Sequence, residues 1–211
     1  DAWAANATGA ANLARVAAEF GVTLVHISTD YVFDGALDRA YTESDALCPL
    51  GVYAQTKAAA DLAVAAAPRH YILRTSWVIG EGSNFVRTMA SLAERGIDPK
   101  VVDDQIGRLT FTEDLVRGIR HLLDAHAPFG VYNLTGSGDA HSWVDIARRV
   151  FELTGHDPAR VTGVSTDEYF ASAAGAVAPR PRNSLLNLSK IEASGFAPAD
   201  ADESLEAYLR A

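Results

Sequence analysis

The sequence of 211 residues has a formal net charge of −9, and its 48% hydrophobic and 21% charged residues are ordinary for a globular protein. An acidic chain without a basic stripe is not expected to bind nucleic acid, and no apolar run approaches the ~20 residues that cross a bilayer. Cys48 is the only cysteine, which excludes an internal disulfide and favours the reducing cytoplasm as the location.

Helices and short apolar strands alternate along the first three quarters of the sequence. The expected helices cover residues 2–20, 52–67, 84–95, 112–125 and 142–154, and Ser142 is the expected N-cap of the last. The expected strands cover residues 23–27, 71–73, 100–102 and 131–134, with a polar, irregular segment over residues 28–49. This alternation predicts an α/β fold with a partial Rossmann-type parallel sheet flanked by helices.

The character of the sequence changes after Gly155. The stretch up to Arg182 is rich in turn-forming residues, namely Pro158, Gly163, Gly175, Pro179 and Pro181, and predicts a lid or a small C-terminal substrate-binding lobe. We therefore expect residues 1–154 to form the later part of a dinucleotide-binding domain. Residues 155–211 are expected to form mainly the substrate-binding lobe, interleaved with the first part in space, with the acidic segment 200–206 as a solvated helix start.

The residues most suggestive of chemistry are Thr29, Tyr53 and Lys57. Tyr53 and Lys57 lie four residues apart on one face of an expected helix. A nearby ammonium favours the phenolate and lowers the phenol pKa from its usual value near ~10, so Tyr53 could act as a general acid or base. Thr29, at the end of the preceding strand, could bind the same substrate oxygen. The pair alone also fits a surface tyrosine beside a solvated lysine, but the order of strand, Ser-Thr, polar loop and helix favours catalysis.

Four separated segments occur in a characteristic order. They are Ser28-Thr29-Asp30-Tyr31-Val32-Phe33-Asp34-Gly35, the helix that carries Tyr53 and Lys57, Arg74-Thr75-Ser76-Trp77-Val78, and Val102-Asp103-Asp104-Gln105-Ile106-Gly107. Together they resemble the dTDP-4-dehydrorhamnose reductases of the extended short-chain dehydrogenase/reductase superfamily. The resemblance runs from about Asn6 to near the C-terminus and includes Arg180-Pro181-Arg182-Asn183-Ser184-Leu185-Leu186.

The resemblance implies a reaction and a role for each matching residue. NADPH or NADH would deliver hydride to C4 of dTDP-4-dehydro-L-rhamnose and give dTDP-L-rhamnose, a step of nucleotide-sugar and cell-surface polysaccharide biosynthesis. Tyr53 would protonate the C4 oxygen, Lys57 would lower the Tyr53 pKa and bind the nicotinamide ribose, and Thr29 would hydrogen-bond the carbonyl. The implied cofactor-binding residues are Tyr53, Lys57 and Ser28, and the implied substrate-binding residues are Asp30, Trp77, Gln105 and Arg182.

The sequence departs from the family in its glycines. Such enzymes begin with a strand and a Gly-rich turn that holds the cofactor pyrophosphate at a helix N-terminus. No such pattern follows a strand here, and Gly136-Ser137-Gly138 is expected to be a loop. We therefore expect the first βα units to precede Asp1, the 211 residues alone to bind NAD(P)H poorly, and an apolar sheet edge to be exposed. Arg108 and the following Leu109-Thr110-Phe111-Thr112 are more similar to two-domain proteins in which an epimerase precedes the reductase.

Two alternative functions stay open at this point. One is another sugar-nucleotide enzyme of the same superfamily, an epimerase or a dehydratase, although a dehydratase usually carries an acidic pair where Thr29 is followed only by Asp30. The other is a non-catalytic, reductase-like regulatory subunit, against which the intact Thr29, Tyr53 and Lys57 argue. The expected substrate is a dTDP-sugar. Two further partners stay open: a second copy of the chain in a homodimer, and a 3,5-epimerase that is either fused to the chain or separate.

The remaining candidate residues favour structural roles. His26 is expected to be packed and hydrogen-bonded within a strand, and His121 and His126 lack the spacing of metal ligands, so no metal site is expected. The indole side chains of Trp3 and Trp143 are expected in the core. Arg180 and Arg182 could clamp a diphosphate or merely anchor a loop.

Overall fold

A three-stranded parallel sheet organises the computed structural model, which describes residues 1–173 and 175–210. Its strands lie in the order β1 (Leu24–Thr29), β2 (His70–Thr75) and β7 (Gly130–Asn133). The register aligns Ser28 with Arg74 and Arg74 with Asn133, so the carboxyl ends of all three strands meet at one edge. Polar side chains at these ends therefore share one region of the molecule.

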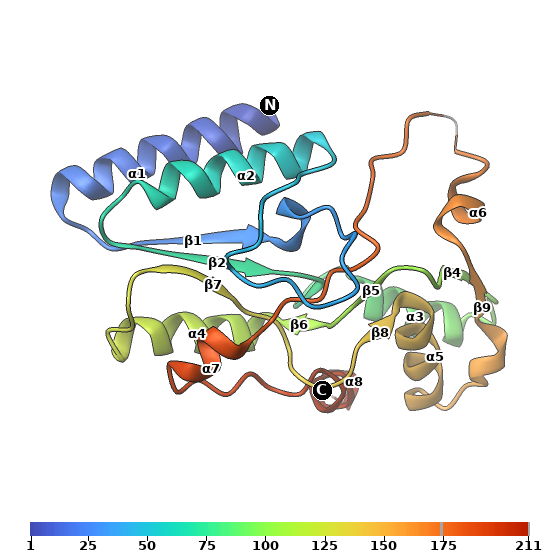
Figure 1. Cartoon of the computed structure of the whole chain (residues 1–211). Helices are drawn as coiled ribbons and strands as arrows, with labels where there is room; N and C mark the ends of the chain where they lie inside the picture. The colour runs from blue at the N-terminus through green and yellow to red at the C-terminus, as the bar shows by residue number, and fades with distance from the viewer. Residues whose placement is uncertain (174, 211) are drawn as a thin grey trace.

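Helices cover both faces of this sheet (Figure 1). One face carries η1 (Trp3–Thr8), α1 (Gly9–Phe20) and α2 (Val52–Ala65), and the other carries α4 (Thr112–Asp124) and α7 (Ser189–Ala193). Helix α1 ends at Gly21, whose φ of 64° suits a glycine C-cap. Small side chains such as Ala14 and Ala60 let the two helices pack closely over Ile72. The predicted α/β fold, with a parallel sheet flanked by helices, is confirmed.

A second group of elements lies beyond the carboxyl ends of the strands, toward the right of Figure 1. Its short strand pairs are β3 (Val78–Ile79) with β6 (Thr110–Phe111), β4 (Lys100–Val102) with β9 (Thr162–Val164), and β5 (Ile106–Gly107) with β8 (His141–Ser142). Its helical elements are η2 (Asp30–Val32), α3 (Phe85–Glu94), α5 (Trp143–Leu153), η3 (Pro158–Arg160), α6 (Thr166–Phe170) and α8 (Ala201–Arg210).

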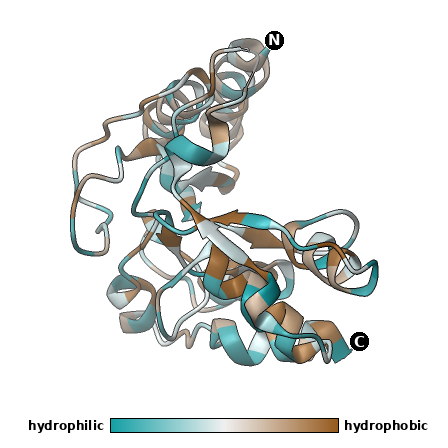
Figure 2. Ribbon diagram, turned by 90° about the vertical axis from the view of Figure 1, so that its right-hand side faces the viewer, coloured by the Kyte–Doolittle hydropathy of each residue, from teal (hydrophilic) through white to brown (hydrophobic). Residues whose placement is uncertain are grey.

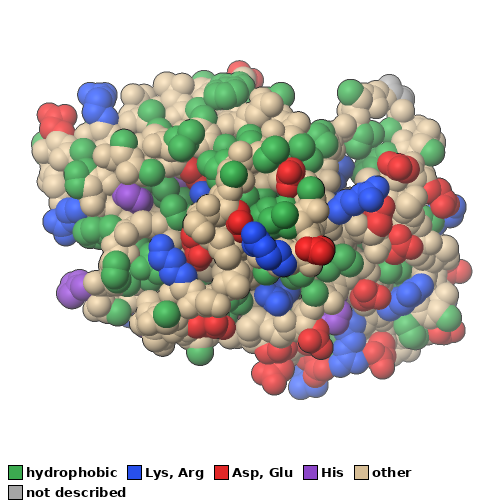
Figure 3. Space-filling view, viewed as in Figure 1, with side chains coloured by type: hydrophobic (Ala, Val, Ile, Leu, Met, Phe, Trp, Pro, Cys, Tyr) green, Lys and Arg blue, Asp and Glu red, His purple; other side chains and the backbone are tan. Residues whose placement is uncertain are grey.

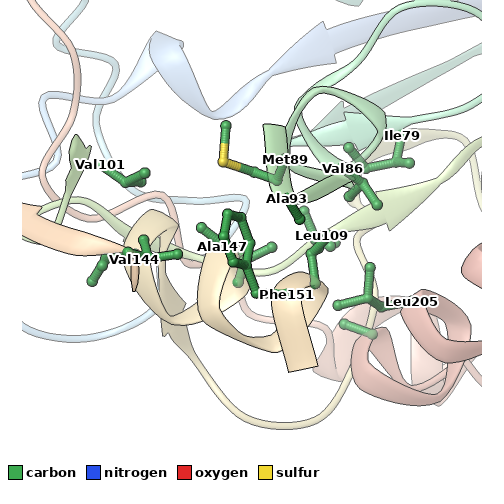
Figure 4. Close-up of a cluster of buried hydrophobic side chains, with 14 residues drawn as sticks. Ile79, Val86, Met89, Ala93, Val101, Leu109, Val144, Ala147, Phe151 and Leu205 are labelled. Atoms are coloured by element: carbon green, nitrogen blue, oxygen red, sulfur yellow. The ribbon is translucent and has the colours of Figure 1, made fainter. Parts of the chain in front are cut away.

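The largest apolar cluster holds this second group together. Val86 of α3, Phe151 of α5 and Leu205 of α8 are almost fully buried and converge with Ile79 (Figure 4). Helix α5 begins with the expected Ser142 cap, here a reciprocal capping box with Asp145. Figure 2 shows hydrophobic segments along the central strands, as burial of a sheet between helices requires.

Several details differ from the expectations. Strand β1 continues beyond the predicted residues 23–27 because its pairing with β2 extends to Thr75, and it ends at Thr29, the residue expected at the end of this strand. Strand β4 lies outside the main sheet and pairs with β9 of the C-terminal stretch. The placement of Trp3 in the core was wrong: the side chain is 50% exposed, because no residue of η1 is buried. Trp143 is partly buried against the main cluster.

Charged side chains of both signs are distributed over the visible surface (Figure 3). Acidic and basic side chains are intermixed over the face seen in Figure 3, without a basic stripe. Across the described part of the chain, no helix combines the length and the apolar character that a membrane span requires.

Candidate active site

Thr29, Tyr53 and Lys57 meet near the carboxyl end of β1. Thr29 is the last residue of that strand, and Tyr53 and Lys57 occupy the first two turns of α2, which packs on it. The Lys57 ammonium donates a hydrogen bond of 2.5 Å to the backbone carbonyl of Ile27, two residues before Thr29. The structure therefore joins the helix and the strand at the point where the sequence predicted acid–base chemistry.

The protonation of Tyr53 is set by its surroundings. Burial raises the pKa of the Tyr53 phenol, the Thr29 side chain partly lowers it, and the nearby Asp30 charge raises it again. The net result is a phenol that stays protonated at neutral pH, rather than one whose pKa Lys57 has lowered as expected. About half of the Tyr53 side chain is exposed, so its hydroxyl is accessible to a substrate.

Asp30 is a buried carboxyl directly beside Thr29. The Thr29 hydroxyl donates a 3.0 Å hydrogen bond to Asp30 Oδ1 and accepts one of 3.2 Å from the Tyr31 amide. Burial raises the pKa of Asp30 to about 6, although the Ser184 and Thr29 side chains hold it down in part. Asp30 Oδ2 and the Ser28 hydroxyl are buried and find no hydrogen-bond partner among the described residues, so both can serve a bound molecule.

An open cavity of about 360 Å³ begins at Tyr31. The Tyr31 ring meets Tyr53 edge-on, with ring centroids 6.0 Å apart, so one residue of the cavity wall contacts the predicted acid–base residue. Arg180 lies over the Phe170 ring at 4.8 Å and interacts with the Tyr31 hydroxyl, whose pKa it lowers against the larger effect of burial. The other lining residues include Phe85, Lys100, Gln105, Trp143 and Tyr169.

The predicted substrate residues fall in different places. Gln105 lines the cavity, and its amide donates a 2.9 Å hydrogen bond to Thr166 of α6. Trp77 stacks on Trp143 with ring centroids 3.8 Å apart and has an unusual φ of 49°, so it lies behind a wall of the cavity. The Arg182 side chain is exposed and is not among the residues that line the cavity.

Most of the aromatic lining of this cavity was not predicted from the sequence. Tyr31 stood inside a recognised segment, and Tyr169 and Phe170 stood eleven and ten residues before Arg180. Aromatic residues near a basic residue in a stretch rich in turns were the available clue. Of the two arginines weighed for a diphosphate clamp, the structure brings Arg180 to Tyr31.

The residues present suit a nicotinamide cofactor better than a metal ion. Within residues 1–173 and 175–210, no three His, Cys, Asp or Glu side chains gather as a metal site would require. The accessible Tyr53 phenol, the Lys57 ammonium and the unpartnered Ser28 hydroxyl offer polar groups for the nicotinamide ribose at one edge of the sheet.

Comparison with known proteins gives a consistent result. The family model described as the RmlD substrate binding domain matches residues 1–211. The chain is 41% identical to a dTDP-4-dehydrorhamnose reductase of Sinorhizobium fredii over 91% of its own length and 67% of that protein. It is 38% identical to the spore coat polysaccharide biosynthesis protein SpsK of Bacillus subtilis, covering 99% of this chain and 71% of that protein.

One similar solved structure contains a bound cofactor. The dTDP-4-dehydrorhamnose reductase of Bacillus anthracis in complex with NADP is similar with a TM-score of 0.87 and 33% identity, over 97% of this chain and 71% of that one. The chain thus spans about 70% of the length of these relatives.

Proposed function

The chain belongs to the RmlD substrate-binding-domain family, and we propose that it is the sugar-binding and proton-donating part of a reductase. The reaction is the reduction of the C4 ketone of dTDP-4-dehydro-L-rhamnose to dTDP-L-rhamnose, with NADPH as the preferred nicotinamide cofactor. The observation that carries the proposal is the accessible Tyr53 phenol, whose pKa burial raises, beside Thr29 and with Lys57 one turn away on α2. The choice of NADPH is supported by the NADP bound to the similar Bacillus anthracis reductase.

The chain's own residues supply the proton and hold the oxygen. When bound, the cofactor supplies a hydride for C4. Tyr53 then donates its proton to the C4 oxygen as negative charge develops there, which completes the addition of two hydrogens to the carbonyl. The Thr29 hydroxyl binds the same oxygen, and the Lys57 ammonium, one turn along α2 from Tyr53, binds the nicotinamide ribose.

The cavity at Tyr31 suits the nucleotide half of the substrate. Its aromatic side chains Tyr31, Phe170 and Trp143 offer surfaces for a pyrimidine, and Arg180 offers a guanidinium for the diphosphate. Asp30, with one unpartnered oxygen, can accept a hydrogen bond from a sugar hydroxyl. Trp77 and Gln105 stay proposed substrate residues, while Arg180 replaces Arg182 as the proposed diphosphate contact. A homodimer, a fused or partner 3,5-epimerase and the cytoplasm as location stay predictions from the sequence.

A product assay tests the proposal. The intact enzyme is incubated with NADPH and either dTDP-4-dehydro-L-rhamnose or dTDP-glucose, and the nucleotide sugars are separated and identified. We expect NADPH oxidation and dTDP-L-rhamnose with the first substrate only. Conversion of dTDP-glucose without NADPH oxidation would indicate a dehydratase, and no conversion of either would favour a regulatory subunit.

A further inference from the structure

A short series of hydrogen bonds ends at the wall of the cavity at Tyr31. Asp104 Oδ1 accepts a 2.5 Å hydrogen bond from the Thr166 hydroxyl and one of 3.0 Å from the Thr166 backbone amide. The same hydroxyl contacts the side-chain amide of Gln105 at 2.9 Å. Gln105 is only 5% exposed and lines the cavity, whereas Thr166 is not one of the lining residues. These hydrogen bonds therefore connect α6 to the cavity wall.

The Asp104 carboxylate fixes the direction of each hydrogen bond in this series. A carboxylate only accepts, so the Thr166 hydroxyl donates its single proton to Asp104. Toward Gln105 the same hydroxyl can then only accept, and the group that faces it is the NH2 end of the amide. The carbonyl oxygen of the side chain, Oε1, is consequently the end of Gln105 that is left for a molecule in the cavity.

The backbone on either side of Gln105 is fixed as well. The Asp103 amide donates a 3.0 Å hydrogen bond to the Val164 carbonyl. The Ile106 amide donates one of 2.8 Å to the Arg182 carbonyl. A side-chain amide on such a backbone cannot exchange its oxygen and nitrogen without losing the hydrogen bond at its NH2 end, which is unfavourable in a buried place. Gln105 is thus an acceptor whose orientation is set before a ligand binds.

Gln105 contributes a type of group that the other polar side chains of the cavity wall do not. Lys100, Arg180 and Trp143 only donate hydrogen bonds, and the tyrosine and threonine hydroxyls of the wall can donate or accept. The amide oxygen of Gln105 only accepts. A ligand group that faces it must therefore carry a hydrogen to donate.

Helix α6 brings flat aromatic surfaces close to this acceptor. Tyr169 and Phe170 follow Thr166 within one helical turn, about 6 Å along the axis, and both rings line the cavity. A pyrimidine that packs on these rings has its edge within reach of the Gln105 amide. On that edge, thymine and uracil carry a hydrogen at N3, whereas cytosine presents a lone pair.

We propose that Gln105 is a specificity-determining residue that accepts a hydrogen bond from N3–H of the substrate's thymine, and that Thr166 and Asp104 are positioning residues that orient its amide. This role rests on the proposed function, which assigns the cavity to the nucleotide half of a dTDP-sugar. Base selectivity itself can be measured by nucleotide binding, without turnover.

Binding of dTDP, dUDP and dCDP to the intact protein tests the role of Gln105. Calorimetry gives a dissociation constant for each nucleotide. We expect dUDP and dTDP to bind about tenfold more tightly than dCDP, because the cytosine N3 lone pair would face Oε1 and leave this buried acceptor unpaired. Gln105→Leu removes the acceptor and should remove most of this preference. An equal preference in the wild type and in Gln105→Leu would overturn the proposal, as would a wild type that binds none of the three nucleotides.

Thr166→Val tests the orientation of the amide. Valine has the shape of threonine without its hydroxyl, and the backbone amide of residue 166 can still bind Asp104. The Gln105 amide is then free to turn its NH2 end to the cavity, so the affinity for dCDP should rise while that for dUDP falls. Thr166→Ser keeps the hydroxyl and should keep the preference. Thr162→Val, at an exposed threonine of β9, is the matched control.

The outcomes separate orientation from a purely structural effect. Loss of affinity for dUDP and dCDP by the same factor in Thr166→Val would show that Thr166 only supports the wall, and would overturn its assignment. Should Thr166→Val not fold, Gln105→Leu and Thr166→Ser still decide the proposal. The proposed reaction fails separately, if the intact enzyme prefers dUDP over dCDP but does not oxidise NADPH with dTDP-4-dehydro-L-rhamnose.

Discussion

At the scale of single residues, the reaction depends on which groups hold a proton at neutral pH. Tyr53 keeps its proton because burial and the Asp30 charge raise its pKa. A protonated phenol is the form that a ketone reduction needs, since the proton must be donated to the developing alkoxide. Lys57, one turn further along α2, is proposed to hold the nicotinamide ribose beside this proton donor.

Replacement of Tyr53 by Phe isolates the proton donor. The substitution removes one hydroxyl and keeps the ring that meets Tyr31, so substrate binding should be largely retained. We expect kcat to fall by at least ~10²-fold with little change in KM, the range attributed to a positioned general acid. Steady-state kinetics of the intact enzyme measure both constants. Near-normal turnover of Tyr53→Phe would exclude this residue as the acid and favour the regulatory alternative.

Asp30 gives the folded state a specific pH dependence. Its pKa is raised from 3.8 to about 6 by burial, so the folded state binds a proton more tightly than the unfolded state. The protonated form stabilises the fold below about pH 4, and this contribution is lost as pH rises toward 6. Relative to Asp30→Asn, the wild type should therefore lose on the order of 3 kcal/mol of unfolding free energy across this interval. Denaturant unfolding at several pH values measures the difference, and a constant difference would contradict the burial of an ionisable Asp30.

At the scale of elements, Trp77 is held in an unusual backbone conformation by its neighbours. Its φ of 49° is rare for a bulky residue. Trp143 stacks on one side of the indole, and Gly107 of β5 approaches so closely that a Cβ there would lie 2.7 Å from the Trp77 ring. The stack places Trp143 in the cavity wall, so the shape of the cavity depends on this contact.

Substitution of Gly107 by Ala tests that dependence. The added methyl group must displace Trp77 and, with it, the Trp143 ring. We expect KM for the nucleotide sugar to rise about tenfold and the tryptophan fluorescence to change, since ~1.4 kcal/mol of binding corresponds to a factor of ten. Gly9→Ala is the matched control, because its Cβ would meet nothing closer than 3.6 Å. Unchanged KM and fluorescence in Gly107→Ala would show that the position of Trp77 does not affect substrate binding.

The sequence predicted elements whose pattern is local and missed contacts that depend on the fold. The helices at residues 52–67 and 112–125 and the strand at residues 100–102 were recognisable from periodicity and caps, and the structure has them within two residues. The pairing of β4 with β9 joins segments about sixty residues apart, and no local pattern encodes it. The Gln105–Thr166 hydrogen bond and the cavity at Tyr31 were invisible for the same reason, since their partners come from separate segments.

At the scale of the whole molecule, the described residues include side chains that could bind the nicotinamide end of a dinucleotide. Tyr53, Lys57 and Ser28 lie together at the carboxyl end of β1 or on α2 beside it. Gly136-Ser137-Gly138, the Gly-rich segment nearest in pattern to a phosphate-binding turn, follows β7 as a loop. The Asp200 carboxylate lies directly against Gly138, so this loop has an acidic neighbour, which is unfavourable for an anionic pyrophosphate. Strand β1 forms an edge of the sheet, where Ile27 is 41% exposed.

Titration of the 211-residue chain with NADPH tests whether these residues bind only the nicotinamide end of the cofactor. Because pyrophosphate binding normally uses backbone amides of a Gly-rich turn after a strand, we expect the 211 residues alone to bind NADPH weakly, with a dissociation constant above ~1 mM. Calorimetry or nicotinamide fluorescence gives the affinity. Micromolar binding would show that these residues contain a pyrophosphate site elsewhere.

Transfer of a labelled hydride tests whether the enzyme reduces the C4 ketone. The intact enzyme is given NADPH deuterated at the transferable position of the nicotinamide together with dTDP-4-dehydro-L-rhamnose, and the product is analysed by NMR. We predict dTDP-L-rhamnose with one deuterium at C4, and loss of this product in Tyr53→Phe. A sugar product without deuterium, or with deuterium at another carbon, would contradict it.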